Sequence, residues 1–168
     1  TGWDYIGEPT PYHTRNSYFG TIDTAGFPKD AYYVVQAAWL DPKTHPMVHL
    51  FPYWDFNEGQ LIDLCACTNA HSVELFVNGE SLGRKVLDSA KGRTASWQAA
   101  YHPGSVKVVA YDENGKVVAT DEQDSFDDSA MVCLQADRKT ISGDGRELAF
   151  ITITTRDKNG NPVRNAND

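Results

Sequence analysis

Aromatic and acidic side chains that could hold a polar ligand lie close together near the start of the chain. Trp3, Asp4, Tyr5 and Glu8 are separated by glycine and isoleucine and followed by prolines. An aromatic ring can stack on the apolar face of a sugar, and carboxylates can accept hydrogen bonds from its hydroxyl groups. Because glycine and proline interrupt regular elements, we expect an irregular loop at the rim of a binding site.

Other residues that could support catalysis or metal binding are not spaced for it. His45 and His49 stand four apart, but Pro46 lies between them and a strand pattern follows, so we expect no metal site. The sequence also contains no Ser-His-Asp arrangement, phosphate loop or dinucleotide fingerprint. We therefore expect no metal and no cofactor.

The cysteines suggest packing rather than chemistry. Cys65, Cys67 and Cys133 make neither an even disulfide framework nor a paired metal motif. Cys65 and Cys67 lie two apart in a predicted strand, so both thiols should point to the same face. We interpret them as small apolar fillers, with a redox or metal role as the alternative.

Charge and hydropathy exclude two classes of partner. The net charge is -8 at pH 7, and the 15 basic residues are scattered along 168 residues. This pattern argues against a nucleic-acid partner. No apolar run approaches the roughly 20 residues that a membrane-spanning helix needs, so we expect no membrane partner.

The first segment, residues 1–45, is predicted to end in a helix. Pro28 and Asp30 favour a helix start, and we expect the helix over about 29–39. Its apolar residues recur at three- and four-residue spacing, at Tyr32, Val35, Ala38 and Trp39. Such an aromatic helix needs a partner surface, so it should dock on the rest of the chain, form a homodimer or fray.

The second segment, residues 46–122, has a period of two. Strands are predicted over 47–51, 61–68, 72–77, 80–86, 94–99, 105–111 and 116–120. Asn78-Gly79 is a strong two-residue hairpin signal, and 112–115 indicates a second hairpin. Seven or so short strands with a turn every 8–12 residues predict an antiparallel β-sandwich of immunoglobulin-like type, for which this segment is long enough. The chain as a whole is predicted to be mainly β.

The third segment, residues 126–168, has too few strands for a domain of its own. An acidic stretch over 121–128 reads as a linker or an exposed edge, and strands are predicted over 131–136 and 147–156. Two or three strands have open edges and only half a core. We interpret this segment as an incomplete second β-sandwich.

A cluster of aromatic residues between the first two strands allows two readings. Phe51, Tyr53, Trp54 and Phe56 could form a carbohydrate-stacking patch, or a surface that packs the sandwich onto a neighbouring domain. Consecutive aromatic residues cover both faces of a strand, which favours packing.

Four stretches resemble the glycoside hydrolase family 2 β-galactosidases, especially the multidomain enzymes of gut Bacteroidetes. These stretches are 1–12 (TGWDYIGEPTPY), 17–20, 25–30 and 73–83 (VELFVNGESLG). The resemblance covers nearly the whole chain, and its first block is specific. It implies a parent enzyme that hydrolyses O-glycosidic bonds of a galactoside or related glycan and is periplasmic or secreted.

The resemblance also implies what each segment does. Residues 1–45 would be the loop after strand 8 and the last helix of a catalytic (β/α)8 barrel, followed by the complete sandwich and the start of the next. Retaining glycosidases need two carboxylates about 5–5.5 Å apart, which the family carries on barrel strands 4 and 7, upstream of Thr1. We therefore expect no catalytic residue here; Trp3, Asp4 and Glu8 would help to bind substrate. The chain would be a non-catalytic accessory sandwich, or alternatively an independent carbohydrate-binding module.

Overall fold

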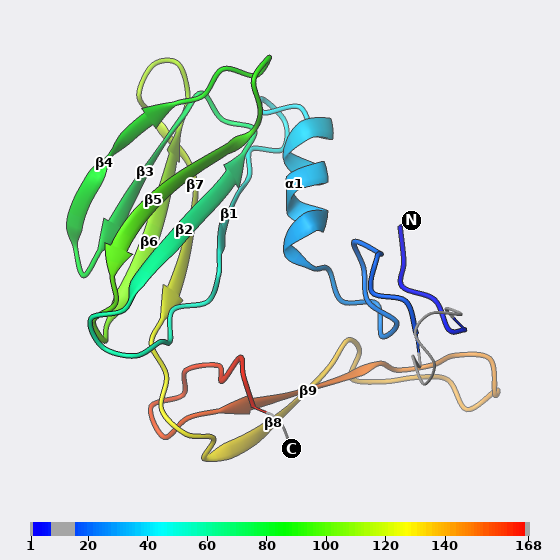
Figure 1. The fold of residues 1–168 in the computed structure, drawn as a ribbon. Helices are drawn as coiled ribbons and strands as arrows, with labels where there is room; N and C mark the ends of the chain where they lie inside the picture. Colours follow the sequence, from blue (N-terminus) through cyan, green and yellow to red (C-terminus); the bar gives the residue numbers. More distant parts are fainter. Residues whose placement is uncertain (1, 8–15, 167–168) are drawn as a thin grey trace.

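Two antiparallel β-sheets packed face to face form the body of the molecule, with a helix against one side and a separate β-hairpin below (Figure 1). The structure is a computed structural model and describes residues 2–7 and 16–166. Its elements are α1 (Asp30–Trp39), β1 (Val48–Phe51), β2 (Leu61–Thr68), β3 (Ser72–Val77), β4 (Glu80–Val86), β5 (Thr94–Ala100), β6 (Ser105–Tyr111), β7 (Val117–Asp124), β8 (Met131–Ala136) and β9 (Ile151–Arg156).

The strand order agrees with the predicted sandwich. One sheet has the order β1-β2-β5 and the other the order β4-β3-β6-β7, and every pair of neighbours is antiparallel. A mainly β fold with antiparallel sheets is therefore confirmed. The predicted strands 61–68, 72–77, 80–86, 105–111 and 131–136 coincide with observed strands.

Alternating apolar residues build the core between the two sheets. On β2, Ile62, Leu64 and Ala66 point inward, while the residues between them face outward. On the opposite sheet, Val73 and Leu75 of β3 are fully buried. Because successive strand residues point to opposite faces, this alternation puts one side of each strand in the core.

The aromatic cluster belongs in part to the core of the sandwich itself. Trp54 is 0% exposed and Trp97 is 7% exposed. The Trp54 ring packs edge-on against Tyr101, with 5.0 Å between ring centroids. The expectation that this cluster packs onto a neighbouring domain is therefore wrong for Trp54, because its ring fills the space between the sheets.

The turn after β3 has the geometry that its two residues favour. Asn78 and Gly79 both have positive φ, 49° and 84°. This backbone matches the twist of the flanking strands in a two-residue hairpin. The Asn78 side chain also accepts a hydrogen bond from the Ser105 amide at 2.8 Å, which ties the turn to the start of β6.

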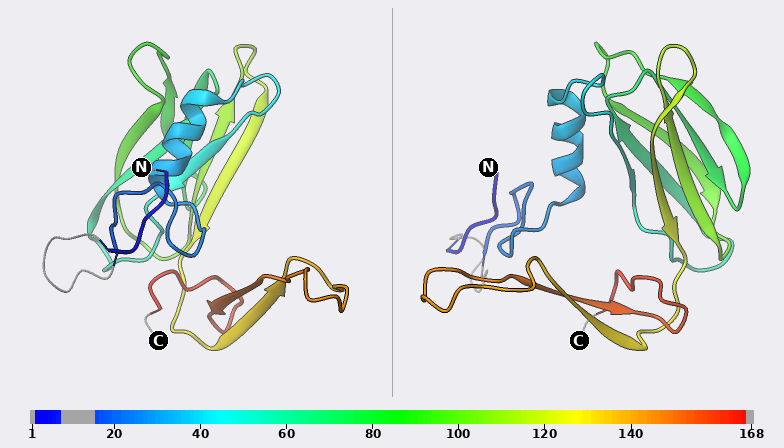
Figure 2. Two further views of the ribbon diagram at one scale, coloured as in Figure 1. Left: turned by 90° about the vertical axis from the view of Figure 1, so that its right-hand side faces the viewer. Right: turned by 180° about the vertical axis from the view of Figure 1, so that it is seen from behind.

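Helix α1 packs against the outer face of the three-stranded sheet (Figures 1 and 2). Ala37 is fully buried there, and the Tyr33 ring stacks on His49 of β1. Docking on the rest of the chain, one of the three predicted outcomes, is thus confirmed. The apolar periodicity had indicated a face that includes Trp39, but Trp39 is 83% exposed.

Within residues 2–7 and 16–166, no helix is long and apolar enough to cross a membrane.

The acidic stretch is an edge strand for half of its length. β7 continues through Asp121 to Asp124 as the last strand of the four-stranded sheet. Asp121 is not a linker residue: its carboxylate accepts a hydrogen bond from the Leu50 amide of β1 at 2.8 Å. This contact joins the edges of the two sheets.

The hairpin β8–β9 lies apart from the sandwich and is joined to it through residues 125–130 (Figure 2). Buried Asp157 accepts hydrogen bonds from the amides of Asp127, Asn159 and Asn161. The Asn161 side chain donates to the Ser125 carbonyl at 3.1 Å. These bonds fix the turn after β9 to the connecting segment.

Two leucines on the same strand test the assignment of the core. We expect Leu64→Ala to lower the free energy of unfolding by about 2–5 kcal/mol, because it leaves a cavity between the sheets. Leu61→Ala is the matched control, since Leu61 is 63% exposed, and should cost less than about 1 kcal/mol. Urea unfolding followed by tryptophan fluorescence measures both. Equal losses for the two variants would contradict this core.

Candidate functional site

Two of the three predicted binding residues, Trp3 and Asp4, lie on a short extended segment beside residues 16–29. Trp3 forms a parallel β-bridge with Ile22. The Asp4 amide donates to the Ile22 carbonyl at 2.8 Å, and the Ile22 amide donates to the Gly2 carbonyl at 3.0 Å. The backbone of this segment is therefore held by neighbouring chain even though it belongs to no long strand.

Asp4 anchors the segment through its carboxylate. One oxygen lies 2.6 Å from the Lys29 ammonium group, and the other accepts a hydrogen bond from the Gly20 amide at 2.8 Å. The side chain is only 2% exposed. The hydrogen bond from Lys29 outweighs burial and lowers the pKa of Asp4 below its ordinary value of 3.8, so the group is an anion at neutral pH.

Gly20 makes this close contact possible. A Cβ atom at this position would lie 2.2 Å from the Asp4 nitrogen and 2.2 Å from the Trp3 carbonyl carbon. Only glycine can bring its amide so near to the Asp4 backbone and carboxylate without displacing them.

The three predicted binding residues thus have different surroundings. Trp3 is 62% exposed and can present its ring to a ligand, whereas Asp4 is buried and bonded to protein groups. Glu8 lies outside the described residues. The arrangement of Trp3 and Asp4 suits a rim on which the aromatic ring is accessible and the carboxylate holds the backbone that carries it.

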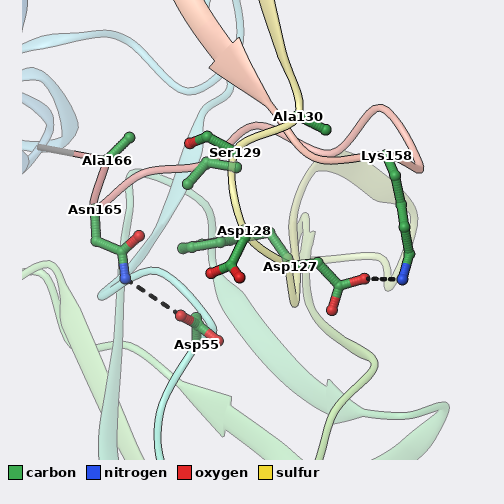
Figure 3. A pocket seen from close by; sticks show the side chains of 10 residues that line it. Asp55, Asp127, Asp128, Ser129, Ala130, Lys158, Asn165 and Ala166 are labelled. Atoms are coloured by element: carbon green, nitrogen blue, oxygen red, sulfur yellow. Dashed lines mark hydrogen bonds and ion pairs between the residues drawn. The ribbon is translucent and has the colours of Figure 1, made fainter. Parts of the chain in front are cut away.

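A second candidate location is an open pocket where the sandwich meets the hairpin (Figure 3). Its volume is about 750 Å³. It is lined by Asp55, Phe126, Asp127, Asp128, Ser129, Ala130, Lys158, Val163, Asn165 and Ala166. The side-chain amide of Asn165 donates a hydrogen bond to the Asp55 carboxylate at 3.3 Å, and Lys158 forms an ion pair with Asp127 at 3.1 Å. Carboxylates, an amide and the Phe126 ring are groups that can contact a polar ligand.

One charged cluster was not anticipated. His49 of β1 lies between Asp30 of α1 and Asp121 of β7. The histidine spacing predicted only that no metal site is formed, and the sequence placed Asp121 in a linker or an exposed edge. The one sequence signal for this cluster was a histidine on the outward side of a predicted strand. Its two acidic partners are 19 and 72 positions away in the sequence, so local patterns could not identify them.

The cysteines have surroundings that suit apolar fillers. Cys65 and Cys67 lie on the outward side of β2, the side on which α1 docks, and both are free thiols, as is Cys133. Burial raises the pKa of Cys67 to about 11, which disfavours the reactive thiolate. Among the described residues, no three His, Cys, Asp or Glu side chains are grouped to hold a metal ion.

Solved structures of glycoside hydrolases contain a segment with a similar fold. A β-glycosidase from Bacteroides vulgatus matches 96% of this chain with a TM-score of 0.88 and 37% identity, and the match covers 20% of that chain. A glycosyl hydrolase family 2 member from Bacteroides cellulosilyticus matches 96% with a TM-score of 0.84 and 27% identity, covering 25% of that chain. Residues 59–119 match a family described as a domain of unknown function, DUF4982.

The chain is homologous to a segment of the glycoside hydrolase family 2 enzymes, as the sequence resemblance predicted. It is 47% identical over 166 residues to Beta-galactosidase BoGH2A of Bacteroides ovatus, a match that covers 96% of this chain and 19% of that protein. It is also 37% identical over 126 residues to a putative beta-glucuronidase of Formosa agariphila, covering 70% of this chain and 12% of that protein. The chain thus spans about a fifth or less of the length of these relatives.

Two glycines test the anchoring of the Trp3 segment. We expect Gly20→Ala to speed amide hydrogen exchange at Asp4 and Ile22 by about tenfold or more, because the added methyl group separates the two backbones. Gly2→Ala is the control, since nothing lies within 4 Å of a Cβ at that position. Exchange that is equally slow in both variants, measured by NMR or mass spectrometry, would show that Gly20 does not hold this contact.

Proposed function

We propose that this chain is a non-catalytic accessory part of a family 2 enzyme that hydrolyses a β-galactoside or a related glycan. The similarity to a protein named as a β-galactosidase, over 96% of this chain, supports a β-galactoside as the substrate of the parent enzyme. A relative named as a putative beta-glucuronidase makes a β-glucuronide the second substrate to test. The parent enzyme is proposed to be periplasmic or secreted.

The observation that carries the accessory role is the placement of the tryptophans. Trp54 and Trp97 lie in the core of the sandwich and are no more than 7% exposed. A glycan-binding module normally presents its aromatic rings on the surface, where they can stack on sugar rings. The sandwich instead uses these rings for its own stability and offers its outer face to α1.

Residues 1–45 are proposed to belong to the catalytic domain and to reach the sandwich through α1. Among the described residues, Trp3 is the candidate for contact with sugar, because its ring is exposed while its backbone is held in place. Asp4 is proposed to support that ring by its bonds to Lys29 and Gly20, and Glu8 is retained as a candidate hydrogen-bond acceptor. The sandwich then acts as a buttress for this rim.

Independent glycan binding is the alternative, and one observation favours it. Tyr53 is 37% exposed, stacks on Phe56 and lies 6.0 Å from the Phe126 ring, centroid to centroid. Phe126 lines the pocket that also contains Asp55 and Asn165. These groups form the described surface on which a glycan could bind without the catalytic domain.

The isolated 168-residue chain separates these functions. We expect no hydrolysis of 4-nitrophenyl β-galactoside or β-glucuronide, and no retardation in affinity electrophoresis on galactans. Hydrolysis that is abolished by Asp4→Ala or Glu8→Ala would overturn the accessory role. Retardation that is abolished by Phe126→Ala would instead establish the binding module.

Trp3 is tested in the complete enzyme that contains this segment. We expect Trp3→Ala to reduce kcat/KM by about 10- to 100-fold, because a stacking contact with the sugar is lost. Trp39→Ala is a control of the same residue type, since Trp39 is also exposed but lies at the far end of α1. Unchanged kcat/KM in the Trp3 variant would remove Trp3 from the sugar site.

A further inference from the structure

His49 occupies the point where three elements of the chain meet. It lies on the outward side of β1, opposite Cys67 of β2. Its Nε2 atom is 2.9 Å from Asp30 of α1, and its Nδ1 atom is 3.4 Å from Asp121 of β7. The side chain is 17% exposed. The Tyr33 ring covers it at a centroid separation of 3.8 Å and an interplanar angle of 21°.

The surroundings of the ring match its protonated form. A neutral imidazole has one N–H donor and one acceptor nitrogen, whereas the protonated ring donates from both nitrogens. Both nitrogens of His49 face a carboxylate, so the neutral ring would place an acceptor nitrogen against an anionic oxygen. Asp121 is held as an anion: burial opposes this, but bonds from His49 and the Leu50 amide lower its pKa.

The charges around the ring favour the cation over the neutral form. Burial by itself disfavours the charged ring, but the bonds to Asp121 and Asp30 outweigh it and raise the pKa of His49 above its ordinary value of 6.5. The other titratable groups that face this cluster are Tyr33 and Cys67, and burial raises the pKa of each. Arg164 reaches the cluster only through its charge interaction with Tyr33.

The same contacts continue to the candidate sugar-binding rim. Asp30 is the first residue of α1, and Lys29 directly before it pairs with Asp4 at 2.6 Å. Lys29 makes no side-chain cap to the helix; its ammonium group contacts Asp4 and also donates to the Tyr18 carbonyl at 3.2 Å. A series of side-chain contacts, continued by the peptide bond between Lys29 and Asp30, therefore runs from the sandwich edge to the residue beside Trp3. Its members are Asp121, His49, Asp30, Lys29 and Asp4.

The geometry points to a pH-dependent clasp in which protonated His49 joins Asp30 to Asp121 and so positions α1 and the Trp3 segment on the sandwich. This inference goes beyond the proposed function and does not require it. Because the pKa of His49 is raised in the folded chain, the stabilisation is complete below pH 6.5 and is lost as the pH rises through the raised value. Tyr33 and Cys67 remain protonated over that range, so the loss belongs to His49.

The test is a pH titration of the 168-residue chain. NMR of the imidazole protons should place the pKa of His49 above 6.5, and Asp121→Asn should lower it. Amide protection of residues 30–39, corrected for intrinsic exchange, should fall several-fold between about pH 6 and pH 9, because the charged form of His49 is lost over that range. His49→Gln, which keeps a polar side chain but cannot carry charge, should abolish this fall.

Two further variants keep the test decisive. His102→Gln removes the exposed histidine that lies 3.6 Å from Glu58, and it should leave the pH dependence of α1 unchanged. If His49→Gln does not fold, Asp30→Asn serves instead, because the Asp30 side chain is 59% exposed. A His49 pKa at or below 6.5, or a fall in protection that survives Asp30→Asn, would overturn the clasp.

Discussion

Burial of apolar side chains between the two sheets is the interaction on which every other part of the molecule depends. Leu64, Val73, Leu75 and Trp54 are removed from water there, and apolar burial is the main favourable contribution to folding. Neither α1 nor the β8–β9 hairpin has a core of its own. Each keeps its place through contacts with the sandwich or with the short segments attached to it, so their positions are secondary to the formation of this core.

The contacts made by the attached segments are of a different kind from the core. α1 combines one fully buried alanine, Ala37, with a stacked ring and a charged cluster around His49. The Trp3 segment relies on Lys29 and Asp4, and the hairpin on Asp157 and Asn161. Polar contacts specify geometry but add little net stability. The sandwich therefore supplies stability, and the charged residues determine how the flanking segments sit on it.

Local patterns placed the strands but not all of their ends: β7 runs to Asp124, beyond the predicted 116–120, and β9 begins at Ile151 instead of 147. They were insufficient for the surroundings of the strands. Alternation predicted β2 and β3, and Asn78-Gly79 predicted the turn between β3 and β4, because these features depend on a few adjacent residues. The docked face of α1 could not be read in this way: Ala37 is buried and Trp39 is exposed, since the sheet and not the periodicity selects the face. Trp54, the bonding of Asp4 and the role of Asp121 depend equally on partners distant in sequence. The sugar-binding role of Trp3 and Glu8 and the barrel origin of residues 1–45 remain predictions.

The register of the hairpin has a consequence for how the chain is made. Pairing of Leu134 with Ile153 and of Ala136 with Ile151 places these side chains on one face together with Val132, and the four large ones are 60–69% exposed. During synthesis the sandwich precedes this hairpin, so it can fold while the apolar ribbon is still uncovered. Such ribbons with open edges are what chaperones bind and what nucleates aggregation. The β8–β9 hairpin, rather than the sandwich, is therefore the part of the described chain with an aggregation-prone surface.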